Sequence, residues 1–357
     1  MSDHLGMTNV QGHIRLGRWK WAAPSLEEHS EAGSLRVGNK FYVIGGYQTL
    51  TRMCPKMQIC DINTGNWSYG PELPAGFPLS HAGIASDGKF LFVVSGQPGP
   101  ACEPATDRAW SLHLENMTWQ PMAPLPAVRY APLLEYVDGS LHLISGAIEE
   151  RETISKDHFI LQIRDREAQD TATLPRLEEQ RWRQGPPIPE GGDHAGSVVL
   201  EGKIYVIGGE HGHAGMTMDA SKCCGAYWVH NYLFRFDPVK EEWERLADMP
   251  FGSSHIESQI AVLGNRIVVL GGTGDRDIFI DRVQEYDPAQ NRWRQLHRLP
   301  MPRKGGVVWE KDGFVCFNGG QILPNKHKPL ERPVVSESMA AKLKRGSWWD
   351  FFYAGSK

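Results

Sequence analysis

The chain has 357 residues, of which 41% are apolar and 22% are charged, and its formal net charge is −4. No long uncharged apolar run is present, so we expect no membrane contact, and no basic block supports binding to nucleic acid. The first residues lack the apolar core of a secretion signal, and the six cysteines follow no disulfide-framework spacing, so we expect a cytoplasmic protein.

A Trp-x6-Pro spacing recurs along the chain, at Trp67/Pro74, Trp119/Pro126, Trp182/Pro189, Trp243/Pro250 and Trp293/Pro300. Each Trp is followed 27 or 29 residues later by the second residue of a small pair, at Gly96, Gly146, Gly209, Gly272 and Gly320. Counting back 27 residues from Gly46 of the first such pair leads to Trp19. The chain therefore contains six copies of one unit, and the last copy takes its Trp from the N-terminal region.

Each copy contains four short strand-like runs. In the fourth copy a strand around Ser197–Leu200 leads through the turn Glu201-Gly202 to the apolar run Ile204–Ile207. After the paired glycines and a variable loop, a third run, Leu233–Asp237, precedes the strand that carries Trp243. A four-stranded sheet with two apolar faces needs neighbours on both sides, which radial packing provides. The sequence predicts an all-β, six-bladed β-propeller of four-stranded antiparallel blades, closed by an N-terminal strand.

The order of an apolar run, Gly-Gly, Tyr-Asp-Pro, Trp and Pro resembles the Kelch repeat. The fifth copy matches this order closely, with Gly271-Gly272, Tyr286-Asp287-Pro288 and Trp293. The second and third copies depart from it, because Ser95-Gly96 and Ser145-Gly146 replace the double glycine. The resemblance implies a propeller, and Kelch propellers include both enzymes and binding modules.

We expect the propeller to span residues 12–321 and to be followed by a C-terminal extension, 322–357. The strand around Gly17–Ala22 should supply the outer strand of the last blade, which removes the free edges of an open ring. For the third strand of that blade we expect residues 348–353, Trp-Trp-Asp-Phe-Phe-Tyr. A loose or partner-docked tail is the alternative.

Polar side chains recur where each copy enters its first strand. Stepping back 17 and 15 positions from the second small residue gives His29 and Glu31, Leu79 and His81, Arg129 and Ala131, Gly192 and His194, His255 and Glu257, and Arg303 and Gly305. Residues two apart on a strand share a face, so these side chains should converge at one mouth of the central channel. We expect His29, His81, His194 and His255 as metal ligands, Glu31 and Glu257 as acid–base groups, and Arg129 and Arg303 as catalytic anion-holding groups. The alternative is the ordinary role of an Arg or His at this point of a Kelch repeat, which is to bond loop carbonyl groups.

A second polar cluster follows Gly208-Gly209, in a loop that is longer than in most copies. It begins with Glu210 and includes His211 and His213. If this loop lies over the channel mouth, Glu210 would join the catalytic groups, and His211 and His213 would add metal ligands.

These features favour an enzyme with a divalent metal (Fe, Mn, Zn or Cu) that acts on a small polar or anionic substrate without a nucleotide cofactor. They leave open whether it is a lyase, an isomerase or an oxidoreductase. One alternative is an interaction module that contacts a protein through its loops. Another is a metal-free sugar mutarotase. Glu210 is similar in position to the Glu that follows a Gly-Gly pair in such an enzyme, but Met216 lies near the position where that enzyme carries an arginine.

Overall fold

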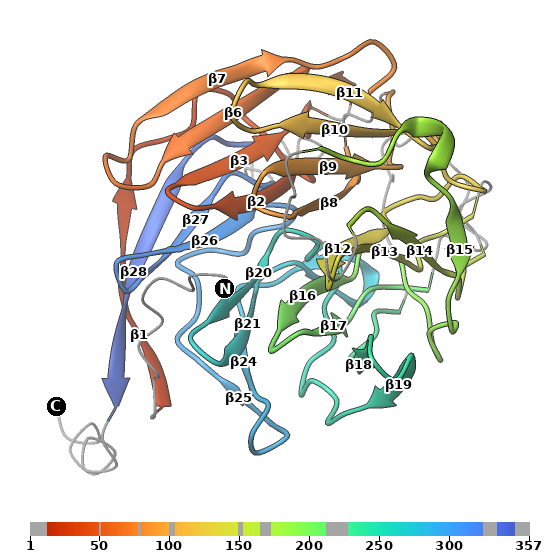
Figure 1. Cartoon of the computed structure of the whole chain (residues 1–357). Helices are drawn as coiled ribbons and strands as arrows, with labels where there is room; N and C mark the ends of the chain where they lie inside the picture. The colour runs from red at the N-terminus through yellow and green to blue at the C-terminus, as the bar shows by residue number, and fades with distance from the viewer. Residues whose placement is uncertain are drawn as a thin grey trace, which may run out of the picture.

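The computed structural model describes residues 13–49, 51–77, 80–99, 104–148, 153–164, 173–211, 228–323 and 334–346. The chain forms six four-stranded antiparallel sheets arranged in a ring, a β-propeller of six blades (Figure 1). The predicted all-β, six-bladed fold is therefore confirmed. In the part of the chain that the structure describes, no helix has the length and apolar character needed to cross a membrane.

Each blade runs from an inner strand at the channel to an outer strand at the rim. Blade one contains β2 (Gly33–Val37), β3 (Lys40–Ile44), β6 (Lys56–Asp61) and β7 (Trp67–Glu72). Blade two contains β8 (Gly83–Ser86), β9 (Phe90–Val94), β10 (Ala109–His113) and β11 (Thr118–Met122). Blade three contains β12 (Leu133–Val137), β13 (Ser140–Ile144), β14 (His158–Gln162) and β15 (Trp182–Gln184).

The remaining blades follow the same order. Blade four contains β16 (Gly196–Leu200), β17 (Lys203–Ile207), β18 (Leu233–Asp237) and β19 (Glu242–Arg245). Blade five contains β20 (Ile260–Leu263), β21 (Arg266–Leu270), β24 (Val283–Asp287) and β25 (Arg292–Gln295). Blade six contains β26 (Val307–Lys311), β27 (Phe314–Asn318), β28 (Ser338–Gly346) and β1 (His13–Ala22). Short elements within the loops are β4 (Tyr47–Thr49), β5 (Arg52–Met53), η1 (Leu177–Glu179), β22 (Thr273–Gly274), η3 (Asp275–Asp277) and β23 (Ile278–Phe279).

The two ends of the chain meet in blade six. There β1 pairs with β28 from His13 opposite Gly346 to Ala22 opposite Ser338, with a register shift between Leu16 and Trp19 (Figure 1). This confirms the predicted closure by an N-terminal strand. The expected third strand at 348–353 lies outside the described residues, and β28 holds that position because Met339 and Ala341 alternate into the core.

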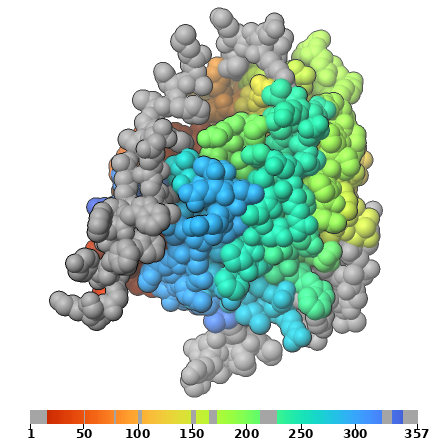
Figure 2. All heavy atoms as spheres, turned by 90° about the horizontal axis from the view of Figure 1, so that it is seen from below, coloured from red at the N-terminus to blue at the C-terminus, as the bar shows by residue number. Residues whose placement is uncertain are grey.

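The hydrophobic core lies between neighbouring blades, which Figure 2 shows side by side from below. Between blades four and five, for example, Tyr205 and Ile207 pack with Ile267 and Tyr286. The propeller has two faces. We call the one that carries the paired small residues and the connections between blades the loop face, and the one that carries the tight turns within each blade the hairpin face.

The second small residue of each pair has to be glycine. Gly272 has a φ of +88°, and a Cβ there would lie 2.3 Å from the carbonyl oxygen of Ser254. At the first position serine replaces glycine in blades two and three. Ser145 has a φ of +58°, and its hydroxyl accepts the N–H of Gly192 at 2.8 Å, which ties blade three to blade four.

Four of the repeated Trp residues link their blade to the one before it by a hydrogen bond. The indole Nε1 of Trp243 donates to the carbonyl of Pro186 at 2.9 Å, and Trp19 donates to Arg298 at 2.9 Å. Trp182 and Trp293 make equivalent bonds to Ala123 and Ala247. The Nε1 of Trp119 differs, because it is buried and has no acceptor among the residues that the structure describes.

This difference gives a matched pair of substitutions. We expect Trp243→Phe to lower the free energy of unfolding by about 1 kcal/mol more than Trp119→Phe does, because only Trp243 loses an inter-blade hydrogen bond. Urea denaturation followed by circular dichroism measures both variants. Equal losses would show that the Trp ring stabilises the blades by packing alone.

Candidate functional site

One position in each blade entry directs its side chain toward the channel axis. The six residues there have positive φ angles between 43° and 65°: Glu31, His81, Ala131, His194, His255 and Gly305. A β-bridge fixes this backbone, since the preceding residue pairs with the residue after the small pair, as Ser254 does with Thr273. The fold therefore places four different polar side chains, from blades one, two, four and five, around one axis.

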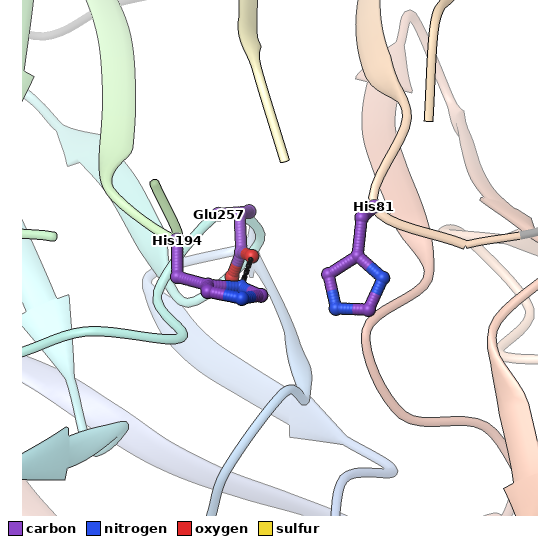
Figure 3. Close-up of side chains that lie close together, drawn as sticks. All are labelled: His81, His194 and Glu257. Atoms are coloured by element: carbon purple, nitrogen blue, oxygen red, sulfur yellow. Dashed lines mark hydrogen bonds and ion pairs between the residues drawn. The ribbon is translucent and has the colours of Figure 1, made fainter. Parts of the chain in front are cut away.

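This geometry corrects the register expected for blade five. His255, rather than Glu257, holds the axial position, because a turn at residues 257–258 separates it from β20. Glu257 lies in that turn, and its carboxylate contacts His194 of blade four. The Oε1 atom of Glu257 is 2.6 Å from His194 Nδ1 (Figure 3).

Glu31 is the centre of the first group of contacts. Its carboxylate lies 3.0 Å from His81 Nε2, 3.7 Å from His255 Nε2 and 3.7 Å from Lys304 Nζ. All four side chains are buried. Lys304 also lies 3.2 Å from Asp277 Oδ1 of η3, so the ammonium group is held between two carboxylates.

The histidines contact one another across the axis. The His194 and His255 rings stack with centroids 4.0 Å apart and an interplanar angle of 11°. His81 meets His194 edge-on at 4.9 Å, as Figure 3 shows with Glu257 beside it. Five blades thus contribute to one continuous buried polar cluster, which we call the axial cluster and which consists of Glu31, His81, His194, His255 and Lys304.

Glu210 of the blade-four loop joins this cluster. Ser254 Oγ donates to its Oε2 at 2.6 Å, and the same oxygen lies 3.6 Å from His255 Nδ1. Two triplets therefore bring candidate ligand atoms within 4.8 Å of one another: His81, His194 and Glu257, and His194, Glu210 and His255. Their nitrogen and oxygen donors fit a transition metal, and metal binding here stays a prediction.

The electrostatics of the axial cluster are dominated by burial and by its own charges. Burial alone would raise the pKa of Glu31, but the charge and hydrogen bond of His81 and the charge of Lys304 hold it well below its ordinary value. Burial alone would lower the pKa of His194, but Glu257 raises it well above the ordinary value. Burial also raises the pKa of Glu210 far above that of a solvated carboxyl. Charge pairing therefore outweighs burial at Glu31 and His194, whereas burial dominates at Glu210.

Three expected site residues lie away from the axis. His29 hydrogen-bonds Asn318 Oδ1 at 2.5 Å, Arg129 pairs with Asp157, and Arg303 pairs with Glu337 at 2.8 Å. The expectation that residues two apart share a face fails here, because the axial residue has a left-handed backbone and breaks the strand alternation.

The expected loop histidines do not join the cluster in the described structure. His211 is exposed, and its ring lies 4.2 Å from that of His230. His213 lies outside the described residues. Sequence reasoning missed Lys304, Asp193 and Ser254. Lys304 and Asp193 occupy the position between the two counted in their copies, and Ser254 lies one residue before His255. Counting back to the residue that forms a β-bridge with the residue after each small pair would have identified them.

On the hairpin-face side of the axial cluster, the channel widens into a cavity of about 1050 Å³. Glu31, His81 and Glu257 lie at its inner end, and the six inner strands form its walls. On the wall, Ser197 Oγ donates to Glu135 at 2.6 Å, and burial raises the pKa of Glu135 to about 7. The axial cluster thus closes the cavity toward the loop face.

Known proteins similar to this chain carry Kelch repeats. A family model for the Kelch motif matches residues 258–300. A Kelch repeat-containing protein of Arabidopsis thaliana is 31% identical over 92% of this chain and 76% of its own length. The Kelch-like protein terF of Aspergillus terreus is 24% identical over 83% of this chain, and a Kelch repeat and BTB domain-containing protein of Vaccinia virus is 23% identical over 83%. This chain spans 61% and 45% of those two proteins.

These relatives overturn the expectation of a metal-dependent enzyme that acts on a small polar or anionic substrate. They are named for Kelch repeats, which favour an interaction module, and none of the three is named as an enzyme. The physical reason for the error is that histidines and carboxylates at one axis suit a catalytic centre and a buried structural cluster equally well. The expected alternative, a module that contacts a protein through its loops, agrees better with the relatives.

Proposed function

Because this chain belongs to the family of Kelch-repeat β-propeller proteins, with a plant relative similar to it along most of both chains, we propose that it is a protein-interaction module. Its partner binds on the loop face at blades four and five. One observation carries this proposal, which is a group of large apolar side chains exposed around a single hollow on that face.

Three residues make up this apolar group. Trp228 is 67% exposed, Ile278 is 62% exposed and Phe251 is 41% exposed. They come from three separate loops of blades four and five, yet they are neighbours. Val229 donates its N–H to Asp275 at 3.0 Å, which joins the loop of Trp228 to the β22–β23 loop of Ile278. Exposed apolar groups of this kind are typical of binding surfaces.

The axial cluster also supports partner binding at the exposed apolar group. Its members are buried and lie within contact distance of one another. Reaching them from the loop face would require an acidic or basic ligand to displace these internal pairs, whereas the apolar group stands at the surface.

We also propose that the protein is cytoplasmic. Cys54, Cys60 and Cys316 are buried free thiols, which suit a reducing compartment.

A binding measurement with matched variants tests the proposed function. The full chain would capture proteins from an extract of the cells that make it, and each captured protein would then be purified and titrated by calorimetry. We expect saturable binding that weakens about tenfold or more in the double variant Trp228→Ser/Ile278→Ser, since it removes exposed apolar anchors. Val239→Ser is the control, because Val239 is 78% exposed but lies on the hairpin face between β18 and β19.

Two results would refute the proposed function. Absence of saturable binding by every captured protein would show that the chain is not such a module. Binding that the double variant and the control affect equally would show that the partner does not use this face.

A further inference from the structure

We propose that the hollow between blades four and five on the loop face binds an extended segment of the partner in which an Asp or Glu side chain lies next to a large apolar side chain. This inference rests on the proposed function and adds the chemistry of the segment that is recognised. Arg282 is the residue that would select the acidic group.

The hollow is formed by two loops that meet between blades. It has a volume of about 420 Å³ and is lined by Val229, Asn231, Pro250, Phe251, Gly252, Gly274, Asp275 and Arg282. A space of this size accommodates side chains of a bound segment rather than a single water molecule. Trp228 precedes the lining residue Val229 in the chain, and Ile278 pairs with the lining residue Gly274 between β22 and β23.

Arg282 lies in the hollow with its charge uncompensated. Its guanidinium carbon is 4.1 Å from the centroid of the Phe251 ring. Within the described ranges no carboxylate pairs with it, and its Nε has no hydrogen-bond acceptor. A guanidinium stacked on an aromatic ring keeps its in-plane N–H groups available, and a carboxylate matches those groups with two parallel hydrogen bonds.

The nearby carboxylates are directed to other groups. Asp281 lies 2.6 Å from Arg298, and Asp277 lies 3.2 Å from Lys304. Asp275 lines the hollow itself, but its Oδ1 accepts the N–H of Val229 at 3.0 Å. Because no carboxylate of the described residues pairs with Arg282, charge complementarity favours a partner that brings one.

The floor of the hollow is held rigidly. The carboxamide of Gln284 accepts the N–H of Phe251 at 3.1 Å and donates to its carbonyl at 2.9 Å. Gln284 is itself buried. Gly252 allows close contact between the loops, because a Cβ there would lie 2.9 Å from the carbonyl oxygen of His230. A preformed surface of this kind loses little conformational entropy when a flexible segment binds.

Peptide selection tests this inference without knowledge of the partner. The probe is a library of random short peptides displayed on phage and selected on the immobilised full chain. We expect the enriched sequences to share an Asp or Glu next to a Leu, Ile, Phe or Trp. A fluorescein-labelled peptide of that sequence should bind, by fluorescence polarisation, about tenfold or more weakly to Arg282→Gln. Arg36→Gln is the matched control, because Arg36 already pairs with Glu310 near the hairpin face.

The remaining results would each overturn the inference. Selection of peptides without an acidic residue, or of no peptide, would exclude an acidic segment. Equal binding by the wild-type chain and Arg282→Gln would place the peptide elsewhere. In each case a captured partner that still requires Trp228 and Ile278 would leave the proposed function standing, so the two failures are distinguishable.

Discussion

Replacing Gly272 by Ala is expected to lower the free energy of unfolding by at least about 3 kcal/mol. The methyl group would lie 2.3 Å from the Ser254 carbonyl oxygen and 2.6 Å from Ile256 Cγ2. Ser254 cannot move away without breaking its bridge to Thr273, and that bridge orients His255 in the axial cluster. Urea denaturation followed by Trp fluorescence measures the loss.

Gly313→Ala is the control for this substitution. Gly313 also has a positive φ, +77°, but a Cβ there meets nothing within 4 Å. We expect this control to lose only about 1 to 2 kcal/mol, which is the cost of a left-handed backbone for a residue with a Cβ. If both variants lost the same free energy, the close contact at the blade entry would not be what requires glycine.

Replacing Lys304 by Met is expected to lower the free energy of unfolding by about 3 to 5 kcal/mol at neutral pH. Met occupies similar space but leaves the buried carboxylates of Glu31 and Asp277 without their cation. Arg36→Met, which breaks an ion pair with a side chain that is 40% exposed, should lose less than about 1 kcal/mol.

The pH dependence of the Lys304→Met variant gives a second measurement. Glu31 has a lowered pKa in the folded protein, so its contribution to stability is present above its ordinary pKa of 4.5 and is lost as the pH falls below that value. In the variant Glu31 loses the charge of Lys304 but keeps His81, so its pKa is lowered less and the variant loses less stability as the pH falls. The difference between the two proteins should therefore narrow below pH 4.5. A difference that is independent of pH would indicate lost packing rather than lost charge pairing.

The sequence predicts the fold well because the propeller repeats its physical requirements. A glycine is needed wherever two backbones cross, as at Gly272. An indole is useful wherever a blade must bond its neighbour, as at Trp243. The position of Trp19 alone indicated that the N-terminal strand completes the last blade. The third strand of that blade was harder to locate, because β28 lacks the Trp-Pro and paired-glycine markers and contributes only small or flexible side chains such as Ala341.

The axial cluster was predicted in part. Four of its members, Glu31, His81, His194 and His255, follow from counting along the repeat. Arg303 does not belong to it, because counting cannot show where a left-handed residue turns the chain. Lys304 was missed for the same reason. The hollow on the loop face could not be predicted at all, because Phe251 and Arg282 belong to different loops and meet only through the pairing of blades.

The pairing of β1 with β28 also governs how the protein is made. On the ribosome β1 emerges first, but its partner strand begins about 300 residues later. At common translation speeds this delay is roughly 15 to 60 s. During that time β1, which carries Leu16 and Trp19, has no partner strand, and its backbone N–H and C=O groups are open to pairing with other chains. Only when β28 leaves the exit tunnel can β1 pair with it and the ring close.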